Sequence, residues 1–411
     1  MLRSRLDVLV VSFYYAPDHT GVAPYSAAMA AGLAARGHRV RAIVGYPHYP
    51  QWRIVEGYAG LRRHELIDGV DVTRVRHPVP RNSTGAGRIV METVFAAHAA
   101  LVRGRRPDVV VVVSPSLPSV ATALCWQRPG ETAVGVVVQD IYCRALIETG
   151  IGGGRGAGPL ARAEGGLLSR ADGVAVIHDV FADVVIGLGV NSGKVTVIRN
   201  WAHISAASDD RRAVRARFGW RDDEVVALHS GNMGEKQGLD NVVDAARLAD
   251  GTESPVRFVL LGDGSRRRTL EAGSAGVGRL QFIDPLPAAE YPDVLAAADV
   301  LVLNEKPGVV EMSVPSKLTS YFAAGRPVVA AVEPGSGSDR EMRASGAGGC
   351  VRSGCPTDLL EAVLRLGNDP VGAAQAGVRG RAYAREALTE SAALDAYEEW
   401  LHRLSCEEGC A

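Results

Sequence analysis

The hydrophobic residues of this chain gather in short, unbroken runs, and segments rich in Ala and Arg separate one run from the next. Within a run, apolar residues follow one another without alternating with polar ones, as in the valines of residues 109–113. Strands of this kind are buried on both faces, and helical segments between them are typical of parallel sheets. The pattern therefore predicts an α/β fold.

The predicted strands form two series. The first contains residues 6–13, 40–44, 109–114, 134–138, 173–177 and 195–198. The second contains residues 225–229, 256–261, 280–283, 300–303 and 328–331. A polar segment near residues 199–222 separates the series, and 411 residues are too many for one ordinary core. We therefore expect two doubly wound domains, residues 1–200 and 201–388, followed by an amphipathic helix at about residues 389–404.

The composition, with 47% hydrophobic and 22% charged residues, is that of a globular protein. No apolar run approaches the roughly 20 residues that span a bilayer, and the amino terminus leads directly into the first predicted strand. We therefore expect no signal peptide and a cytoplasmic location. The six cysteines are scattered and show neither a disulfide framework nor the spacing of a metal site.

The net charge of −1 conceals an asymmetry between the two halves. Residues 1–200 carry 22 Lys and Arg against 15 Asp and Glu, whereas the remainder carries 23 against 31. A basic half can attract an anionic membrane surface or a phosphorylated acceptor, or it can simply be solvated. The basic segment 88–106 also contains apolar residues, so it could rest on the inner face of the cell membrane or form a buried helix with basic ends. We find no nucleic-acid motif and expect no nucleic-acid partner.

A glycine-bearing loop follows the first strand of each series, and ligands of open α/β sheets gather at such strand ends. The first loop, residues 14–25, contains Asp18 and Gly21. Gly21 would let a diphosphate approach the backbone closely. An ordinary turn between a strand and a helix is the alternative.

The loop of residues 230–238 reads SGNMGEKQG and is more informative. Gly231, Asn232, Lys236 and Gln237 offer close backbone approach, amide donors and a cation, which suit a phosphate-bearing ligand. The dinucleotide spacing Gly-x-Gly-x-x-Gly is absent, which argues against a nicotinamide-dependent oxidoreductase. A loop that only caps the following helix is the alternative.

Two further segments could take part in a ligand site. Residues 262–264 read GDG after a strand, and they could pack beside a nucleotide or only turn the chain. Pro315, Ser316 and Lys317 open a predicted helix, whose free amides near Ser316 would face an anion together with the Lys317 ammonium. A purely structural helix is the alternative.

Taken together and in this order, the motifs resemble those of family 4 of the retaining glycosyltransferases. Within that family the chain is most similar to bacterial exopolysaccharide and lipopolysaccharide transferases of the colanic-acid fucosyltransferase type. The matching motifs are YYAPDHTGVAPY at 14–25, YPHYP at 46–50, Gln139-Asp140, GNMGEKQG at 231–238, GDG at 262–264, VPSKL at 314–318 and AAGRPVV at 323–329. They extend over most of the chain.

The resemblance implies a GT-B fold, in which two Rossmann-like domains face a central cleft. The second domain would bind a nucleoside-diphosphate sugar and the first the acceptor, with the final helix packed back on the first domain. The implied reaction is a retaining transfer of a hexosyl group to a hydroxyl of a glycan, lipid-linked or small-molecule acceptor, in exopolysaccharide or other glycoconjugate biosynthesis. The resemblance implies no cofactor and no metal, and the sequence contains no convincing Asp-x-Asp site.

The resemblance also implies roles for individual residues. Negative charge grows on the departing nucleoside diphosphate, and fixed donors aimed at it stabilise the transition state. The residues expected to act in catalysis are Asp18, Gln139 and Asp140, which would orient the sugar or the acceptor, and Lys236 and Lys317, which would meet the diphosphate. The residues expected to bind the donor are Gly21, Gly231, Asn232, Gln237, Gly262, Asp263, Pro315, Ser316 and Ser320.

The chain departs from the family pattern in three places, one of which is Cys143, where proline is expected. The family usually has Arg after the first glycine of the diphosphate loop and Lys before its last, where this chain has Asn232 and Gln237, with Lys236 shifted by one. Two glutamates of the family correspond to Met312 and Ser320. Ser320 could still bind the ribose of the donor, but without charge assistance. A catalytically degenerate nucleotide-sugar-binding protein is therefore one alternative, and a GT-B sugar-nucleotide epimerase or phosphorylase is another.

Overall fold

The computed structural model describes the chain except for residues 1–3, 19–20, 49–50, 81–85, 144–156, 203, 205–206, 209, 311–316 and 407–411. The chain forms two compact units. One consists of Met1–Arg199 together with Ser391–Ala411, and the other of Asn200–Glu390. The polar segment after residue 198 is therefore where the chain passes from one unit to the other.

The first unit contains an eight-stranded sheet with the order β3-β4-β2-β1-β5-β6-β7-β8. Its strands are β1 (Asp7–Ser12), β2 (Arg39–Gly45), β3 (Arg62–Ile67), β4 (Val70–Val75), β5 (Val109–Val113), β6 (Ala133–Val138), β7 (Gly173–Val176) and β8 (Val195–Val197). All neighbouring strands run parallel except β3 and β4, which form an antiparallel hairpin at the edge. Asp68 and Gly69, both with positive φ, make the turn of this hairpin.

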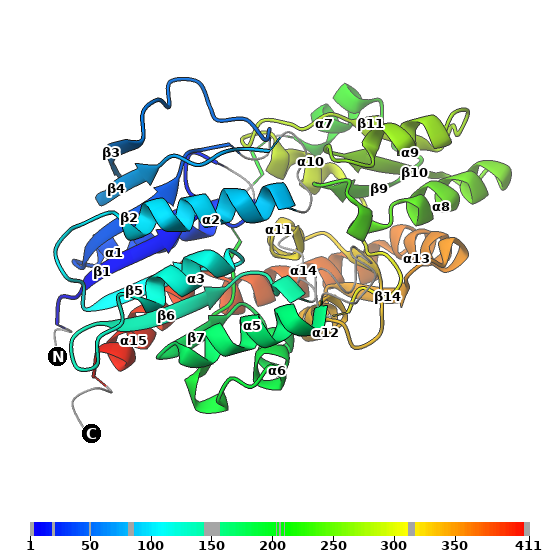
Figure 1. Ribbon diagram of the computed structural model, residues 1–411. Coiled ribbons are helices and arrows are strands. Elements are labelled where there is room, and N and C mark those ends of the chain that lie inside the picture. Colours follow the sequence, from blue (N-terminus) through cyan, green and yellow to red (C-terminus); the bar gives the residue numbers. More distant parts are fainter. Residues whose placement is uncertain are drawn as a thin grey trace. The chain divides into compact units, whose positions relative to one another are not determined.

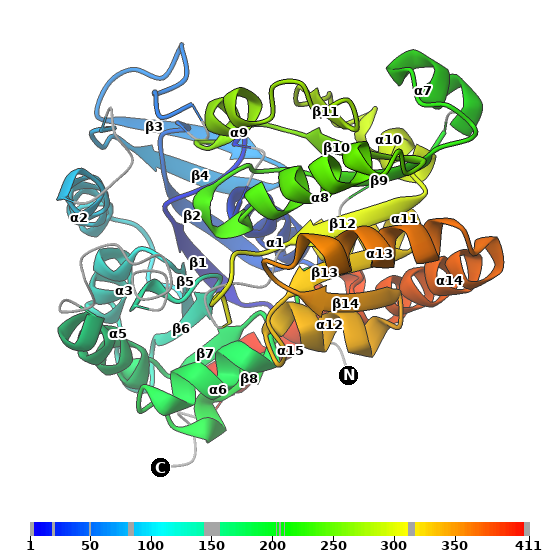
Figure 2. The same ribbon diagram turned by 90° about the vertical axis from the view of Figure 1, so that its right-hand side faces the viewer.

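Helices cover both faces of this sheet. They are α1 (Ala23–Ala35), α2 (Ala86–Ala100), α3 (Leu117–Leu124), α5 (Ala157–Arg170), α6 (Asp179–Gly187) and α15 (Glu390–Cys406), with a short 3-10 helix at Ser192–Lys194. Figures 1 and 2 show α2, α3 and α5 along one face and α15 on the opposite face. Valine-rich strands such as β5 are buried between these layers, which explains why their sequences do not alternate. In the described part of the chain, every helix is too short or too polar to span a bilayer.

The carboxyl-terminal helix α15 joins the first unit through its apolar face. Trp400 and Leu404 are 2% and 4% exposed and lie against Gly135 of β6 and Gly173 of β7. A Cβ atom at either glycine would overlap with these side chains, so the helix can approach the strands only because both positions are glycine. The end of the sequence thus packs on the unit formed by its beginning.

The second unit contains a six-stranded, fully parallel sheet with the order β11-β10-β9-β12-β13-β14. Its strands are β9 (Val225–Ser230), β10 (Val256–Leu261), β11 (Leu280–Ile283), β12 (Val300–Asn304), β13 (Val328–Val332) and β14 (Gly348–Arg352). Its helices are α7 (Arg211–Phe218), α8 (Asp240–Gly251), α9 (Arg267–Gly273), α10 (Tyr291–Ala297), α11 (Lys317–Ala324), α12 (Gly337–Ser345), α13 (Pro356–Gly367) and α14 (Pro370–Ala387), with a 3-10 helix at Glu235–Gln237.

Two hydrophobic clusters cover the faces of this second sheet. Apolar residues of α8, α9 and α13 pack on one face, and those of α7, α10, α11, α12 and α14 pack on the other. Figure 2 shows α8 and α13 on the face nearest the viewer. Each unit is therefore a doubly wound α/β structure, as the two series of apolar runs predict.

Strands β3, β4 and β14 lie outside the strands predicted from the sequence. β3 (RRHELI) and β14 (GGCVR) are edge strands whose residues are exposed or half-buried. Edge strands are covered less than central ones, so their sequences lack the unbroken apolar run on which the prediction relies. β4 (VDVTRV) is largely buried but carries polar residues, among them Arg74.

Replacing Trp400 by Ala should destabilise the first unit by about 3–5 kcal/mol, because a large buried side chain is lost and the space against β6 and β7 cannot close fully. The free energy of unfolding in urea, followed by circular dichroism, measures the loss. Glu399→Ala, at an exposed position of the same helix, is the control and should change stability by less than about 0.5 kcal/mol. A Trp400→Ala protein as stable as this control would show that the helix contributes little.

Candidate functional site

The ends of β9 and β10 bring two glycine-bearing loops into direct backbone contact. The Met233 N–H donates to the Asp263 carbonyl at 2.8 Å. A Cβ atom on Gly262 would overlap with the Gly231 carbonyl, and both glycines have positive φ, 133° and 108°. Gly231, Asn232, Gly262 and Asp263, all expected at a donor site, therefore lie together at the carboxyl edge of the second sheet.

The loop of residues 231–238 is also braced from within and from β12. Gln237 is 8% exposed, and its Oε1 atom accepts a hydrogen bond from the Gly234 N–H at 3.0 Å. Asn304, at the end of β12, donates from Nδ2 to the carbonyls of Gln237 and Gly238 at 2.8 and 2.9 Å. The Gln237 side chain, which was expected to bind the donor, therefore helps to shape the loop. Asn304 holds the same loop and is absent from the residues expected at the site.

Lys317 begins α11 and lies beside the first glycine of this loop. Its Nζ atom is 3.0 Å from Nε2 of His229 in β9, and a Cβ atom on Gly231 would lie 3.8 Å from Nζ. Burial and, next, Lys236 lower the pKa of Lys317 to about 7, while Glu305 opposes the shift. Lys317 therefore lies beside Gly231, close enough to Lys236 for the two ammonium groups to interact.

Tyr321 lies one turn further along α11 and fixes this helix to the end of β9. Its hydroxyl oxygen accepts a hydrogen bond from the Ser230 N–H at 2.8 Å, and Ser230 Oγ lies 2.8 Å from the hydroxyl of Tyr291. Burial raises the pKa of both tyrosines, so both hydroxyls keep their protons at neutral pH. None of these side chains is among the residues expected at the site, although a His-Ser pair ends a buried strand before a glycine in the sequence.

The remaining residues expected to bind the donor lie in or before α11. Ser320 lies within the helix and is 4% exposed. Pro315 and Ser316, as well as Met312, lie outside the described residues.

In the first unit, the expected residues follow β1 and β6, which flank β5 in the sheet. Asp18 is 6% exposed, and its N–H donates to the Tyr15 carbonyl at 3.2 Å. Gly21 has a positive φ of 64° at the turn before α1. Gln139 is 7% exposed and, with Asp140, comes directly after β6. The carboxyl ends of parallel strands share one edge, so these residues occupy the same edge of the first sheet.

Arg74 of β4 fixes the loop that follows β1. Its side chain is 0% exposed; Nε donates to Glu65 at 2.6 Å, Nη1 to the Gly45 carbonyl at 3.3 Å and Nη2 to the Ala16 carbonyl. A buried guanidinium needs such partners to offset the loss of water. Arg74 therefore ties the loop that carries Asp18 to the neighbouring strands.

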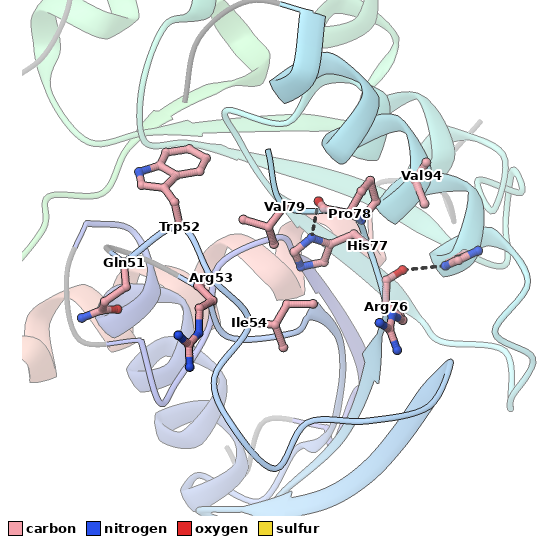
Figure 3. Close-up of a pocket in the computed structure, with 10 residues that line it drawn as sticks. Gln51, Trp52, Arg53, Ile54, Arg76, His77, Pro78, Val79 and Val94 are labelled. Atoms are coloured by element: carbon pink, nitrogen blue, oxygen red, sulfur yellow. Dashed lines mark hydrogen bonds between the residues drawn. The ribbon is translucent and has the colours of Figure 1, made fainter. Parts of the chain in front are cut away.

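A cavity of about 860 Å³ opens in the first unit beside the ends of β2 and β4. Figure 3 shows its lining, which comes from residues 51–54, residues 76–79 and two residues of α2, Val94 and His98. His98 donates from Nδ1 to the Arg76 carbonyl at 2.6 Å, a bond drawn as a dashed line in Figure 3. The cavity is therefore framed by two loops and a helix, and a hydrogen bond joins the helix to the loop of residues 76–79.

The lining of this cavity combines apolar and cationic groups. Trp52, whose φ is 51°, supplies an aromatic ring, and Arg53 and Arg76 supply guanidinium groups. Within the described residues, neither arginine forms an ion pair with a carboxylate. Burial lowers the pKa of His77, so this ring adds no charge at neutral pH. The composition suits a ligand with both a sugar-like or apolar body and an anionic group.

Among the described residues, one group of three could offer ligand atoms to a metal ion: His38, Glu398 and His402. The Leu6 N–H donates to Nδ1 of His38 at 3.2 Å, so this ring carries its proton on Nε2. Nε2 faces Glu398 at 3.5 Å and has no free lone pair for a metal. The group precedes β2 and therefore lies at the amino edge of the sheet, opposite the loops described above.

A family model described as a glycosyl transferase 4-like domain matches residues 20–201, and one described as glycosyl transferases group 1 matches residues 224–369. A candidate colanic acid biosynthesis glycosyl transferase of Escherichia coli K12, WcaI, is 30% identical over 343 residues, which cover 80% of this chain and 84% of that protein.

Solved structures share the architecture of both units. Anabaena Alr3699/HepE in complex with UDP-glucose has a TM-score of 0.69 and 15% identity over 97% of this chain and 100% of its own. Sucrose-phosphate synthase from Thermosynechococcus elongatus has a TM-score of 0.72 and 15% identity over 97% and 99%. At these identities the likeness concerns the fold, which is the GT-B fold of two Rossmann-like units.

Proposed function

The chain belongs to the glycosyltransferase family that combines a glycosyl transferase 4-like domain with a group 1 domain, and on that premise we propose its reaction. It transfers a hexosyl group from a nucleoside-diphosphate sugar to a hydroxyl acceptor with retention of configuration, in exopolysaccharide or other glycoconjugate synthesis. The similarity to WcaI supports this biosynthetic setting, and the UDP-glucose of HepE supports this class of donor.

The observation that carries the proposal is the pair of lysines Lys317 and Lys236, of which Lys317 lies beside Gly231. After burial, Lys236 is the main cause that lowers the pKa of Lys317, which means that the two ammonium groups are close enough to repel each other, while Glu305 opposes the shift. A diphosphate at this place would replace the repulsion by two attractive interactions. The glycines at 231 and 262 leave the backbone open to close approach by such a ligand.

The same groups would promote the reaction. As the bond between the sugar and the diphosphate breaks, negative charge grows on the leaving group, and fixed cations stabilise this charge more in the transition state than in the ground state. The acceptor hydroxyl attacks from the face that the diphosphate leaves, so a nucleophilic carboxylate is not required. Because the chain itself supplies Lys236 and Lys317, we propose that transfer needs neither a metal ion nor a cofactor.

We further assign the acceptor to the first unit. Asp18, Gln139 and Asp140 lie at the carboxyl edge of its sheet and orient the sugar or the acceptor hydroxyl. The cavity beside β2 and β4 receives the rest of the acceptor, with the Trp52 ring against a sugar face and Arg76 near an anionic group.

The first unit also has an exposed apolar and basic surface, at which the protein could meet a lipid-linked acceptor. Ile89 and Val90 of α2 and Leu101 just after it are 56%, 53% and 63% exposed. Arg62 donates to the Leu101 carbonyl at 3.0 Å, and the exposed arginines of residues 103–106 follow. Apolar side chains beside cations favour the surface of an anionic membrane. We propose that this face contacts such a membrane peripherally.

Replacing Lys317 by Ala should lower kcat by about 10²–10³-fold, because a fixed donor to the leaving group is lost. Lys236→Ala should act in the same direction. Donor hydrolysis and transfer are measured with UDP-, GDP- and dTDP-sugars. Lys306→Ala is the control, since this exposed lysine is paired with Glu235 at 2.9 Å, and it should retain activity. Normal turnover in both test variants would show that the diphosphate does not bind at this site.

Replacing Trp52 by Ala should raise the KM for the acceptor about tenfold, because roughly 1.4 kcal/mol of ring contact is lost. Hydrolysis of the donor without acceptor should remain as in the wild type, since the cavity belongs to the other unit. Steady-state kinetics with varied acceptor measure both quantities. Arg5→Gln, an exposed arginine outside both the cavity and the basic surface, is the control, and an equal effect in this variant would argue against an acceptor in the cavity.

Vesicles that contain phosphatidylglycerol should carry the protein upward in a flotation gradient at low salt and release it at high salt. The double variant Ile89→Ser, Leu101→Ser should partition at least about tenfold more weakly. Val371→Ser with Val378→Ser alters two valines of the second unit that are 66% and 69% exposed, and it should float like the wild type. Wild-type protein that stays at the bottom at low salt would contradict membrane contact.

A further inference from the structure

His229 is a buried polar side chain whose orientation follows from its neighbours. It lies in β9, is 0% exposed, and its Nδ1 atom is 3.1 Å from the Val302 carbonyl of β12. A carbonyl oxygen can only accept a hydrogen bond, so Nδ1 carries the proton and Nε2 presents a lone pair. The main chain of the adjacent strand thus selects the tautomer.

The lone pair on Nε2 faces Lys317, whose Nζ atom is 3.0 Å away. Both an ammonium and a neutral amine can donate to this lone pair, so the contact persists in either charge state of the lysine. Burial and, next, Lys317 hold the pKa of His229 well below its ordinary value, while the carbonyls of Val302 and Asn232 oppose the shift. The imidazole is therefore neutral at neutral pH and does not compete with Lys317 for an anion.

The other charged groups that face Lys317 come from two further segments. Lys236 faces it from the loop of residues 231–238, and Glu305 faces it from the end of β12. Glu305 Oε1 accepts a hydrogen bond from Ser338 Oγ at 2.9 Å. Within the described residues, no carboxylate forms an ion pair with Lys317, so the protein holds the lysine through a neutral acceptor.

We propose that His229 is a positioning residue of the donor site, which holds the Lys317 side chain beside Gly231 so that the ammonium meets the diphosphate. This inference rests on the proposed function. A long lysine side chain loses rotamer entropy when it is fixed, and a partner that fixes it beforehand removes this cost from ligand binding. The backbone below the lysine is held as well, because Tyr321 ties the next turn of α11 to Ser230.

The arrangement also couples ligand binding to a proton. With a pKa of about 7, Lys317 is mostly a neutral amine near pH 8. A bound diphosphate stabilises the ammonium and raises this pKa towards the ordinary value, so the amine takes one proton from solvent as the complex forms. Close to one proton is therefore taken up when the ligand binds near pH 8, and the affinity for the diphosphate falls as the pH rises above about 7.

The test uses UDP as the probe and isothermal titration near pH 8, where its phosphates are fully ionised. Titrations in two buffers with different ionisation enthalpies give the number of protons taken up. His229→Asn keeps a donor for the Val302 carbonyl but removes the acceptor for Lys317, and it should bind UDP about tenfold more weakly. His229→Gln restores an acceptor near the position of Nε2 and should bind within about threefold of the wild type.

Two further variants separate positioning from a merely structural role. Lys317→Ala should abolish proton uptake, and adding His229→Asn to it should weaken UDP binding no further, since the two residues act as one unit. Lys306→Ala should leave both affinity and uptake unchanged. Thermal unfolding of each variant shows whether the fold is kept.

The outcomes distinguish the two levels of the proposal. A wild-type protein that binds neither UDP nor any other nucleoside diphosphate would refute the proposed function. A folded His229→Asn variant with wild-type affinity would overturn the positioning role of His229, and wild-type binding without proton uptake would overturn the coupling of binding to a proton. If the Asn variant does not fold, the Gln variant decides: wild-type-like binding and uptake support the role, and a tenfold loss in a folded protein rejects it.

Discussion

The backbone contact between the loops that follow β9 and β10 is the constraint on which the second unit's site depends. The Gly231 carbonyl packs against Gly262, where the Cβ atom of any other residue would collide with it. The Met233 N–H donates a hydrogen bond to the Asp263 carbonyl and so joins the two loops. Main-chain hydrogen bonds join the two loops, and the side chains of Gln237 and Asn304 brace the loop of residues 231–238 as well. Lys317 can then be aimed at a surface with a defined geometry.

The basic side chains inside this protein have two different kinds of partner, a carboxylate or a neutral group. Arg74 and Arg215 are 0% and 3% exposed, and each pairs with a carboxylate, Glu65 at 2.6 Å and Asp299 at 2.9 Å. The carboxylates balance the charge of these arginines, which serve to hold the fold together. Lys317 has a neutral imidazole as its partner and is repelled by Lys236. Within the described residues Lys317 forms no ion pair with a carboxylate, although Glu305 faces it and opposes the lowering of its pKa. A lysine whose pKa is shifted in this way is typical of functional sites.

The doubly wound architecture and the position of the site at strand ends could be predicted, because unbroken apolar runs and glycine loops are local patterns. The edge strands β3 and β14 could not, since little of their surface is covered and their sequences resemble those of loops. Gln237 could be found from its motif, but the hydrogen bond of its side chain to the Gly234 N–H depends on the fold of the loop. The same holds for the cavity around Trp52 and Arg76, which joins segments separated in sequence.

By itself, the sequence determined which segments become strands at the centre of each sheet, which loops carry glycine, and which lysine begins α11, because each of these depends on residues close together in the chain. Only the tertiary structure decided that α15 packs on Gly135 and Gly173, and that His229 in β9 faces Lys317, 88 positions later. Contacts of this kind arise when strands and helices are brought together, and no local pattern of apolar and polar residues records them. The charge state of Lys317 belongs to the same class, since burial by distant elements sets its pKa.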